Sequence, residues 1–362
     1  MPTSSVPPGV DLPALEAFLR TALPSPLAGP LQVDLLAGGR SNLTYLVTDG
    51  AHRWVLRRPP LGHVLETAHD MHREHRLLTA LEHTDVPVPR ALLLAGPEVI
   101  GAPFYLMEFL DGVVLRERPQ LAQLGTTEAV ALADELVDVL ARLHAVDPAA
   151  VGLADLGRPA GYLDRQVRRW GRQLAASHHR DLPDLERLGE RLAGQLPAGP
   201  PATVVHGDYR LDNVVVDPGS GRVVGVLDWE MATLGDPLTD LASAVVWWDG
   251  MSGLDSPVAA VPGDVAGFPG SDRLVGEYGR RTGQDLGALP WYVGFAFYKI
   301  AVIFEGIAHR ALEGLTVGEG FDRLGALVPD LAERGHAALE SHQRRSAGDG
   351  RDGTADGCHT PG

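Results

Sequence analysis

The sequence predicts an α+β protein with two lobes, a small one built on an antiparallel sheet and a larger one that is mainly helical. Two observations lead to this prediction. Short segments with period-2 alternation, separated by glycine turns, fill much of the chain up to about residue 110. Beyond that point, apolar residues recur at helical spacing over long stretches. A chain of 362 residues is long enough for two such lobes.

The smaller, N-terminal lobe is expected over residues 31–110, after an extension of residues 1–30 that carries one short amphipathic helix. The stretch "LQVDLLAGGRSNLTYLVTDGAHRWVLRRPP" predicts three antiparallel strands joined by a glycine turn and a DG turn. Helical spacing follows from about residue 66 to residue 83. Two further strands are predicted by "VPVPRALLLAG" and "PFYLMEFLDG". The lobe is therefore expected to be a mostly antiparallel sheet with one helix inserted after its third strand.

The larger, C-terminal lobe is expected over residues 111–345. The apolar run of residues 291–304 is short for a membrane span and contains Lys299, so we expect a buried helix there rather than a membrane segment. The tail, residues 346–362, has almost no apolar content and is predicted to be disordered. Helices are predicted over about residues 121–144, 160–178, 184–196, 237–248, 272–282, 291–313 and 321–343.

Composition and charge exclude several classes of protein. The formal net charge of −16 argues against a general nucleic-acid binder, which would present a broad basic surface. Cys358 is the single cysteine, so no intrachain disulfide is possible and no cysteine cluster suggests zinc. The N-terminus lacks the basic start and apolar stretch of a signal peptide, so a cytoplasmic location without a membrane partner is expected. Lys299 is the only lysine among 31 basic residues, so arginine counts alone carry little functional weight.

The stretch "VVHGDYRLDNVVVD", residues 204–217, places carboxylates and an amide between two strand-like segments. Asp208 and Asn213 lie on the connecting loop, and Asp228 follows a hairpin that turns at "DPGSG". Because a hairpin brings its ends together, Asn213 and Asp228 can face one point. Such oxygen ligands suit Mg²⁺, which keeps waters and phosphate oxygens in its remaining positions. Asp208 can then accept the proton of an attacking hydroxyl, and the set predicts phosphoryl transfer.

The motifs "HGDYRLDN" and "LDWEMATLGDPLTDLA" resemble the aminoglycoside phosphotransferase-like branch of the protein-kinase-like fold. The resemblance extends over roughly residues 30–340 and implies a bilobal kinase-like structure that uses ATP and Mg²⁺. It implies that Asp208 is the catalytic base and that Asn213 and Asp228 bind the magnesium ion. His206 would support the catalytic loop, and Asp240 would brace the backbone of that loop from the next helix.

The N-terminal lobe then has to supply the nucleotide contacts. A kinase lobe needs a glycine turn over the phosphates, a strand cation that binds them, and a helix glutamate that holds the cation. The strand "WVLRRPP" offers Arg57, with Arg58 on the opposite face, and Glu74 is the expected partner. Arginine can bind phosphate through two parallel hydrogen bonds, so the lack of a lysine here does not imply an inactive site. The other predicted nucleotide contacts are Gly39, Ser41, Asn42, Glu108 and Leu110.

Arginines line one face of the helix predicted near residue 160. In "YLDRQVRRWGRQL" they occupy Arg165, Arg168, Arg169 and Arg172, at i, i+3, i+4 and i+7. This local positive charge in an acidic protein suits an anionic acceptor such as an acyl-coenzyme A, and a solvated helix face is the alternative. Glu230 is assigned to the acceptor site together with these arginines.

The segments "WVLRRPP" and "DRQVRRW" most resemble the subgroup related to the kinase-like domain of certain acyl-CoA dehydrogenases. That resemblance implies phosphorylation of a hydroxyl group on a hydroxyacyl-CoA. Two alternatives stay open, a phosphotransferase for an aminoglycoside or other antibiotic and a nucleotide-binding regulator without activity. A Ser/Thr protein kinase is not expected, because no activation segment ending in Ala-Pro-Glu follows "LDWE".

Overall fold

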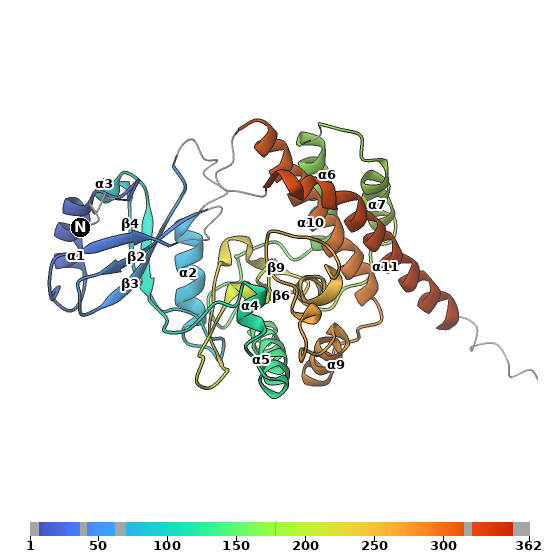
Figure 1. Cartoon of the computed structure of the whole chain (residues 1–362), viewed down its shortest axis with the longest axis horizontal. Coiled ribbons are helices and arrows are strands. Elements are labelled where there is room, and N and C mark those ends of the chain that lie inside the picture. The colour runs from blue at the N-terminus through green and yellow to red at the C-terminus, as the bar shows by residue number, and fades with distance from the viewer. Residues whose placement is uncertain (1–6, 37–41, 62–69, 178, 315–320, 350–362) are drawn as a thin grey trace, which may run out of the picture. The chain divides into compact units, whose positions relative to one another are not determined.

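The computed structural model describes residues 7–36, 42–61, 70–177, 179–314 and 321–349. The chain forms two compact units (Figure 1). Unit 1 comprises Met1–Val114, Pro148–Leu153 and Asn213–Ala232. Unit 2 comprises Leu115–Asp147, Ala154–Asp212 and Thr233–Gly362. The segment that follows the "HGDYRLD" motif is thus grouped with the N-terminal sheet, although it lies far from that sheet in the sequence.

Unit 1 is built on a five-stranded antiparallel sheet with the strand order β1-β2-β3-β5-β4. The helix α2, Met71–Leu81, is inserted after β3, as the sequence predicts. It begins after the N-cap Asp70, whose side chain accepts the Arg73 N–H at 3.1 Å. The predicted helix starts at about residue 66, but residues 62–69 lie outside the described part of the chain. The strands are β1 Gln32–Leu35, β2 Leu43–Thr48, β3 Arg53–Arg58, β4 Ala91–Ala95 and β5 Phe104–Glu108.

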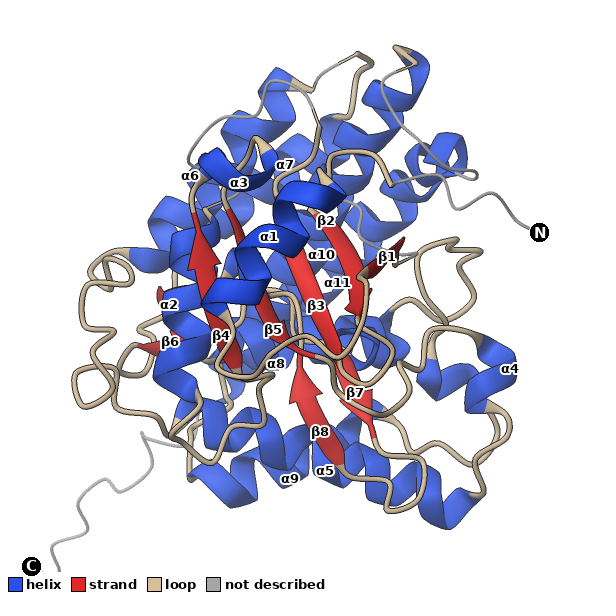
Figure 2. Ribbon diagram, turned by 90° about the vertical axis from the view of Figure 1, so that its left-hand side faces the viewer, coloured by secondary structure: helices blue, strands red, loops and turns tan. Residues whose placement is uncertain are grey.

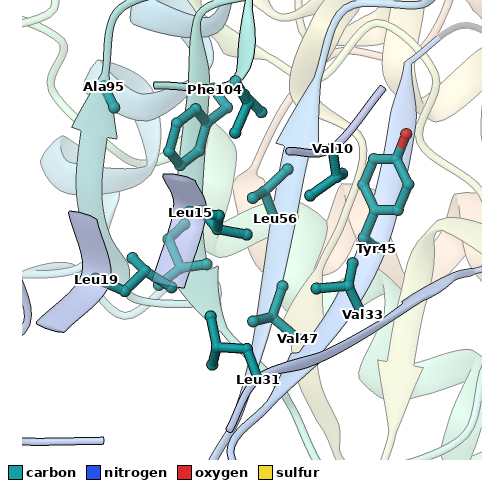
Figure 3. Close-up of a cluster of buried hydrophobic side chains, with 12 residues drawn as sticks. Val10, Leu15, Leu19, Leu31, Val33, Tyr45, Val47, Leu56, Ala95 and Phe104 are labelled. Atoms are coloured by element: carbon teal, nitrogen blue, oxygen red, sulfur yellow. The ribbon is translucent and has the colours of Figure 1, made fainter. Parts of the chain in front are cut away.

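The two faces of this sheet carry different structures. On one face, α1 (Leu12–Ala22) and α3 (Pro97–Ile100) cover an apolar core (Figure 2). Leu15 and Leu19 of α1 pack there with Leu56 and Phe104 of the sheet (Figure 3). The N-terminal helix therefore completes the core of unit 1. Because side chains alternate along a strand, Arg57 lies on the opposite face from Leu56, and α2 packs on that side.

A hairpin of β7, Val214–Val216, and β8, Val223–Val226, also belongs to unit 1. The Asp217 side chain accepts the Ser220 N–H at 3.0 Å in its turn. The Leu227 N–H donates to the Asn213 carbonyl at 2.8 Å, which continues the ladder by one step beyond the strands. The hairpin therefore places Asn213 beside the residue that precedes Asp228.

Unit 2 is mainly helical, with one short two-stranded ladder of β6, Thr203–Val205, and β9, Thr233–Gly235. The helix α8 passes into a π-helical turn, Val246–Gly250. The helix α11 continues to Asp349, so residues 346–349 are helical rather than disordered as predicted. Extending an existing helix needs no new nucleation, so a polar sequence can continue it. The helices are α4 Arg118–Leu121, α5 Thr126–His144, α6 Tyr162–Ala176, α7 Pro183–Ala193, α8 Leu238–Val245, α9 Ser271–Thr282, α10 Leu289–Leu312 and α11 Val328–Asp349.

The helix α10 is, among the described residues, the one helix long and apolar enough to cross a membrane. Its most apolar window is 78% buried inside the protein, where it packs against α11, α8 and α6. Large aromatic side chains such as Trp291 and Tyr292 are fully buried on it. This packing explains the apolar sequence as that of a core helix.

Candidate active site

The predicted magnesium ligands lie at the base of the β7–β8 hairpin. Asn213 is the last residue of a 3₁₀ turn, Leu211–Asn213, and is almost fully buried. Asp228 directly follows Leu227, which is bonded to the Asn213 carbonyl. Asp228 has φ 64° and ψ 65°, and it is the one non-glycine residue with a left-handed backbone in the described part of the chain. Such a backbone costs about 1 kcal/mol outside glycine, and strain of this kind is concentrated at functional sites.

Arg57 connects Asp228 with the helix α2. Its Nη2 donates to Asp228 Oδ1 at 2.6 Å, and its Nε lies 3.0 Å from Glu74 Oε2 in an ion pair without an aligned hydrogen bond. A third carboxylate, that of Glu230, lies 3.6 Å from the same Nη2. The structure thus brings Arg57 together with its predicted partner Glu74, and one guanidinium faces three carboxylates.

Two neutral side chains hold these carboxylates in place. Asn42 Nδ2 donates to Glu74 Oε1 at 3.1 Å and to Glu230 Oε2 at 3.2 Å. Tyr105 donates its hydroxyl to Glu74 Oε2 at 3.0 Å. Asn42, predicted as a nucleotide contact, and Glu230, predicted as an acceptor contact, both lie in the network around Arg57. Tyr105 was not predicted. It lies directly opposite Arg57 in the β3–β5 register, so an alignment of the two predicted strands would have identified it.

The electrostatics of this network follow from burial and from an excess of negative charge. Burial raises the pKa of Glu74, and the nearby Arg57 only partly offsets that effect. Burial opposes the charged form of Arg57, but Asp228, Tyr105 and Glu74 raise its pKa above the ordinary value. With one cation against three carboxylates, the network favours a further cation.

A magnesium ion fits this donor set. Asp228 supplies a carboxylate and Asn213 an amide, both oxygen ligands of the kind that Mg²⁺ prefers. Within the described ranges, no three His, Cys, Asp or Glu side chains gather into a metal site of their own. An ion held by Asn213 and Asp228 would therefore complete its shell with waters and phosphate oxygens, as Mg²⁺ does in phosphoryl-transfer sites.

The predicted nucleotide contacts Glu108 and Leu110 lie at the end of β5 and just after it. The Glu108 N–H donates to the Arg90 carbonyl at 2.9 Å, so an adenine contact from Glu108 would use its carbonyl oxygen. Leu110 packs closely on Gly225 of β8, where an added Cβ would clash with Leu110 Cδ1. The lack of a side chain at Gly225 therefore lets the segment after β5 pack against the hairpin. The predicted phosphate-loop residues Gly39 and Ser41 lie outside the described residues.

In unit 2, β6 leads into the loop that carries the predicted base, Asp208. Gly207 has φ 85°, a left-handed conformation that glycine adopts without steric cost. The Asp240 carboxylate, in the first turn of α8, accepts the His206 N–H at 2.6 Å and the Gly207 N–H at 2.8 Å. The structure therefore has Asp240 holding the loop backbone, in the way that the resemblance implied.

Asp240 is fully buried, and its pKa is nonetheless lowered. Burial alone would raise that pKa, but the hydrogen bond from His144 Nε2 at 3.3 Å and those from the loop backbone stabilise the carboxylate. His206 completes the loop, because its Nδ1 accepts the Asp208 N–H at 3.2 Å. A backbone N–H can only donate, so His206 Nδ1 carries no proton in this arrangement.

Arg210 is a further charged residue of this loop, beyond the predicted site residues. Its Nη2 donates to Asp212 Oδ2 at 2.6 Å, and its Nε lies 3.6 Å from Asp208 Oδ2. The guanidinium lies over the Trp247 ring at 4.2 Å from the centroid. In the sequence, Arg210 lies between Asp208 and Asp212 of the "HGDYRLDN" motif, and this spacing could have predicted a charge pair.

The arginines on α6 differ in how they are engaged. Arg165 donates to the carbonyls of Ala160 and Arg158, and Arg168 donates to Asp164 at 2.9 Å. Arg169 and Arg172 are exposed and form no ion pair with any residue that the structure describes. Of the four arginines predicted to contact the acceptor, Arg169, which lies over the Trp170 ring, and Arg172 carry charge without a carboxylate partner among the described residues.

Comparison with known proteins gives three findings. A model of the phosphotransferase enzyme family matches residues 32–291. The chain is 35% identical over 333 residues to acyl-CoA dehydrogenase family member 10 of Mus musculus, which covers 88% of this chain and 30% of that protein. It is 34% identical over 349 residues to acyl-CoA dehydrogenase family member 11 of Gallus gallus, covering 93% of this chain and 44% of that protein. The chain thus spans less than half the length of these relatives.

Among solved structures, a protein of Ralstonia eutropha JMP134 is similar over most of the chain. It is assigned provisionally to the aminoglycoside phosphotransferases, and it has a TM-score of 0.79 and 33% sequence identity. The match covers 92% of this chain and 99% of that one. This likeness confirms the predicted fold class.

Proposed function

The chain belongs to the phosphotransferase enzyme family, and we propose that it transfers the γ-phosphoryl group of ATP to a hydroxyl group of a small-molecule acceptor with the help of Mg²⁺. The observation that carries the proposal is the network around Arg57 in unit 1. One arginine, fixed by a helix glutamate, lies beside an aspartate at the base of a hairpin. Phosphoryl transfer needs such groups, because its catalysis consists mostly of positioning and charge neutralisation.

Each residue then has a role in the proposed reaction. Asn213 and Asp228 would hold the magnesium ion, which when bound neutralises charge on the phosphoryl group. Arg57 donates hydrogen bonds to phosphate oxygens, and Glu74 holds its guanidinium in place. Asp208 accepts the proton of the acceptor hydroxyl. Asp240 supports this step by holding the loop backbone in place before the acceptor binds.

We further propose that the acceptor is a hydroxyacyl-coenzyme A. The relatives from Mus musculus and Gallus gallus are named as acyl-CoA dehydrogenase family members, and this chain matches one part of each. A phosphotransferase segment in such proteins suits an acceptor that is itself an acyl-CoA. The exposed charges of Arg169 and Arg172 on α6 support the same class of acceptor, since coenzyme A carries several phosphate charges.

An antibiotic phosphotransferase is the second candidate. The name of the Ralstonia eutropha JMP134 protein favours it, and a net charge of −16 suits a cationic antibiotic. The exposed arginines of α6 oppose it, because they would repel a cationic acceptor. A regulator without activity is disfavoured because Asp208, Asn213 and Asp228 are all present.

An acceptor assay separates these candidates. The purified chain is incubated with Mg²⁺ and ATP and with one of three compounds: a hydroxyacyl-CoA, the same acyl-CoA without the hydroxyl, or kanamycin. We expect a phosphorylated product, identified by mass spectrometry, from the hydroxyacyl-CoA alone. The Asp208→Asn variant is the control for transfer that depends on the proposed base. Phosphorylated kanamycin without any phosphorylated CoA ester would establish the antibiotic candidate instead.

A second comparison tests how the CoA ester is recognised. The hydroxyacyl-pantetheine lacks the phosphates of coenzyme A but keeps the hydroxyl and the acyl chain. If the phosphates of the acceptor provide binding energy, this compound should be phosphorylated with a higher KM and a similar kcat. An equal KM for both compounds would exclude recognition of the coenzyme A phosphates.

A further inference from the structure

Lys299 is a charged residue in the otherwise apolar core helix α10. It is the only lysine in a chain whose other basic residues are all arginine. Its Nζ donates a hydrogen bond to the Gly207 carbonyl, directly before Asp208 in the sequence. The same Nζ lies 5.8 Å from the centroid of the Trp170 ring of α6. A buried helix therefore delivers one ammonium group to the backbone of the loop that carries the predicted base.

The peptide group between Gly207 and Asp208 is held at both of its polar ends. Its carbonyl accepts from Lys299, and its N–H donates to His206 Nδ1 at 3.2 Å. The preceding N–H, that of Gly207, is bonded to Asp240 at 2.8 Å. Glycine in a left-handed conformation is permissive about its backbone angles, so these bonds restrict a peptide that would otherwise rotate easily.

An ammonium group suits this position better than a guanidinium. Lysine offers a compact point charge that can meet a single carbonyl oxygen, whereas arginine presents a wide planar fork. Burial lowers the pKa of Lys299, with Asp208 and Asp240 raising it and Arg169 and Arg210 lowering it further. The ammonium group is therefore electrostatically coupled to the Asp208 carboxylate.

We propose that Lys299 is a positioning residue for phosphoryl transfer, acting through the Gly207 carbonyl to fix the peptide that carries Asp208. The inference rests on the proposed function, because it assigns to Asp208 the role of the base. Lys299 does not itself contact the acceptor hydroxyl in this scheme. It acts together with Asp240, which holds the loop from its N–H side.

The first test measures turnover with the hydroxyacyl-CoA. In Lys299→Ala, kcat should fall by about 10²-fold, the cost of a small misplacement of a catalytic group, while both KM values stay within about threefold. Added ethylammonium should restore part of kcat by supplying the missing donor, and ethanol at the same concentration should not. Unchanged kcat, or a loss that ethylammonium does not reverse, would overturn the proposal.

The second test needs no acceptor and no folded variant of Lys299. Because the chain has one lysine, lysine labelled with ¹³C at Cε and ¹⁵N at Nζ gives one side-chain NMR signal. We expect this signal to titrate below the ordinary lysine pKa of 10.5, and lower still in Asp208→Asn, which removes a neighbouring negative charge.

The control for the NMR test is Arg187→Gln, which changes an exposed charge on α7 that pairs with Asp184. It should leave the lysine titration unchanged. A midpoint of 10.5 that is the same in Asp208→Asn would show that the ammonium group lies away from the loop, and this would overturn the inference whatever the acceptor is. A shifted midpoint without any phosphorylated product would instead locate the failure in the proposed function.

Discussion

The groups around Arg57 in unit 1 and the loop of Asp208 in unit 2 are organised in opposite ways. Around Arg57, charged side chains contact other charged side chains, and one cation faces three carboxylates. In the loop, charged side chains also contact backbone groups: Asp240 accepts two N–H groups and Lys299 donates to one carbonyl, while Arg210 pairs with Asp212. The first region has an excess of negative charge that a ligand can neutralise, whereas the second is ordered by the protein alone.

One buried carboxylate from each region, Glu74 and Asp240, shows the difference in the direction of its pKa shift. Burial raises the pKa of Glu74, which lies among other carboxylates. Burial acts on Asp240 too, but hydrogen bonds from His144 and from the loop backbone lower its pKa below the ordinary value. Glu74 also accepts two side-chain hydrogen bonds, so the difference lies in its charged neighbours: it shares one cation with two other carboxylates, which makes its charged form costly.

The largest effect is expected from the loop. Asp208→Asn should keep the fold and the affinity for ATP, because the loop backbone is held by other residues. The kcat should fall by roughly 10²–10⁴-fold, the usual loss when a general base is removed. Steady-state kinetics with the hydroxyacyl-CoA measure this, and a kcat within a few-fold of the parent would contradict the assignment of the base.

The excess of negative charge in unit 1 predicts that one substitution weakens ATP binding in the presence of Mg²⁺ but not in its absence. Asp228→Asn should weaken ATP binding in Mg²⁺ by about 2 kcal/mol or more, the usual cost of removing one member of a charge pair that is buried once the ligand is bound. With EDTA in place of Mg²⁺, the same variant should bind ATP as tightly as the parent or more tightly, because one repelling carboxylate is gone. Calorimetry in the two buffers tests this, and equal affinities of parent and variant in Mg²⁺ would exclude Asp228 as a ligand.

A matched pair of neutral substitutions tests the contrast between the buried carboxylates. Asp240→Asn leaves one acceptor oxygen for two N–H groups, so the free energy of unfolding at neutral pH should fall by about 1–3 kcal/mol. Glu74→Gln removes one of the three carboxylates around Arg57 and should change the free energy of unfolding by less than about 1 kcal/mol. Equal losses in both variants, measured by denaturant unfolding, would contradict the comparison.

The pH dependence of this pair follows from the direction of each shift. Because the folded-state pKa of Asp240 lies below the ordinary 3.8, its contribution is present above pH 3.8 and is lost as the pH falls through the folded value. The difference in the free energy of unfolding between the parent and Asp240→Asn should therefore become smaller below about pH 3.8. For Glu74 the pKa is raised above 4.5, so the parent should lose stability relative to Glu74→Gln as the pH rises past 4.5.

The smallest effect is expected on the surface of unit 2. Arg169→Ser with Arg172→Ser should raise the KM for the hydroxyacyl-CoA by about three- to tenfold and leave kcat unchanged, because exposed charges contribute modest, uniform binding. The effect should shrink in high salt. Arg165→Ser with Arg168→Ser is the control, since these two arginines are already engaged with neighbouring groups. If both double variants had the same KM as the parent, all four arginines of α6 would belong to a solvated helix face.

The sequence predicted what depends on local pattern. Period-2 alternation placed Arg57 and Arg58 on opposite faces of β3. The hairpin rule predicted that Asn213 and Asp228 face one point, and the structure bonds Leu227, the residue before Asp228, to the Asn213 carbonyl. Contacts between distant segments were missed. Asn42 bridges Glu74 and Glu230, and no local pattern reveals which strand end lies beside which hairpin.

The contact of Lys299 also joins segments that are distant in the sequence, and it was missed for the same reason. In the sequence, Lys299 is a lone charge in an apolar run, which argues against a membrane span but does not predict a partner. Its partner is a backbone carbonyl, and backbone groups leave no trace in a sequence pattern. The helical residues 346–349 were missed for a related reason, because composition does not record where a neighbouring helix stops.

The backbone of Asp228 also sets which substitutions the position can accept. A left-handed conformation is easy for glycine, tolerable for asparagine and aspartate, and costly for β-branched residues. In a library of all amino acids at this codon, selection for folded protein should therefore retain glycine and asparagine beside aspartate and deplete valine and isoleucine. Selection for phosphoryl transfer should retain aspartate alone. The difference between the two selections would separate what the chain requires of this residue for folding from what the reaction requires of it.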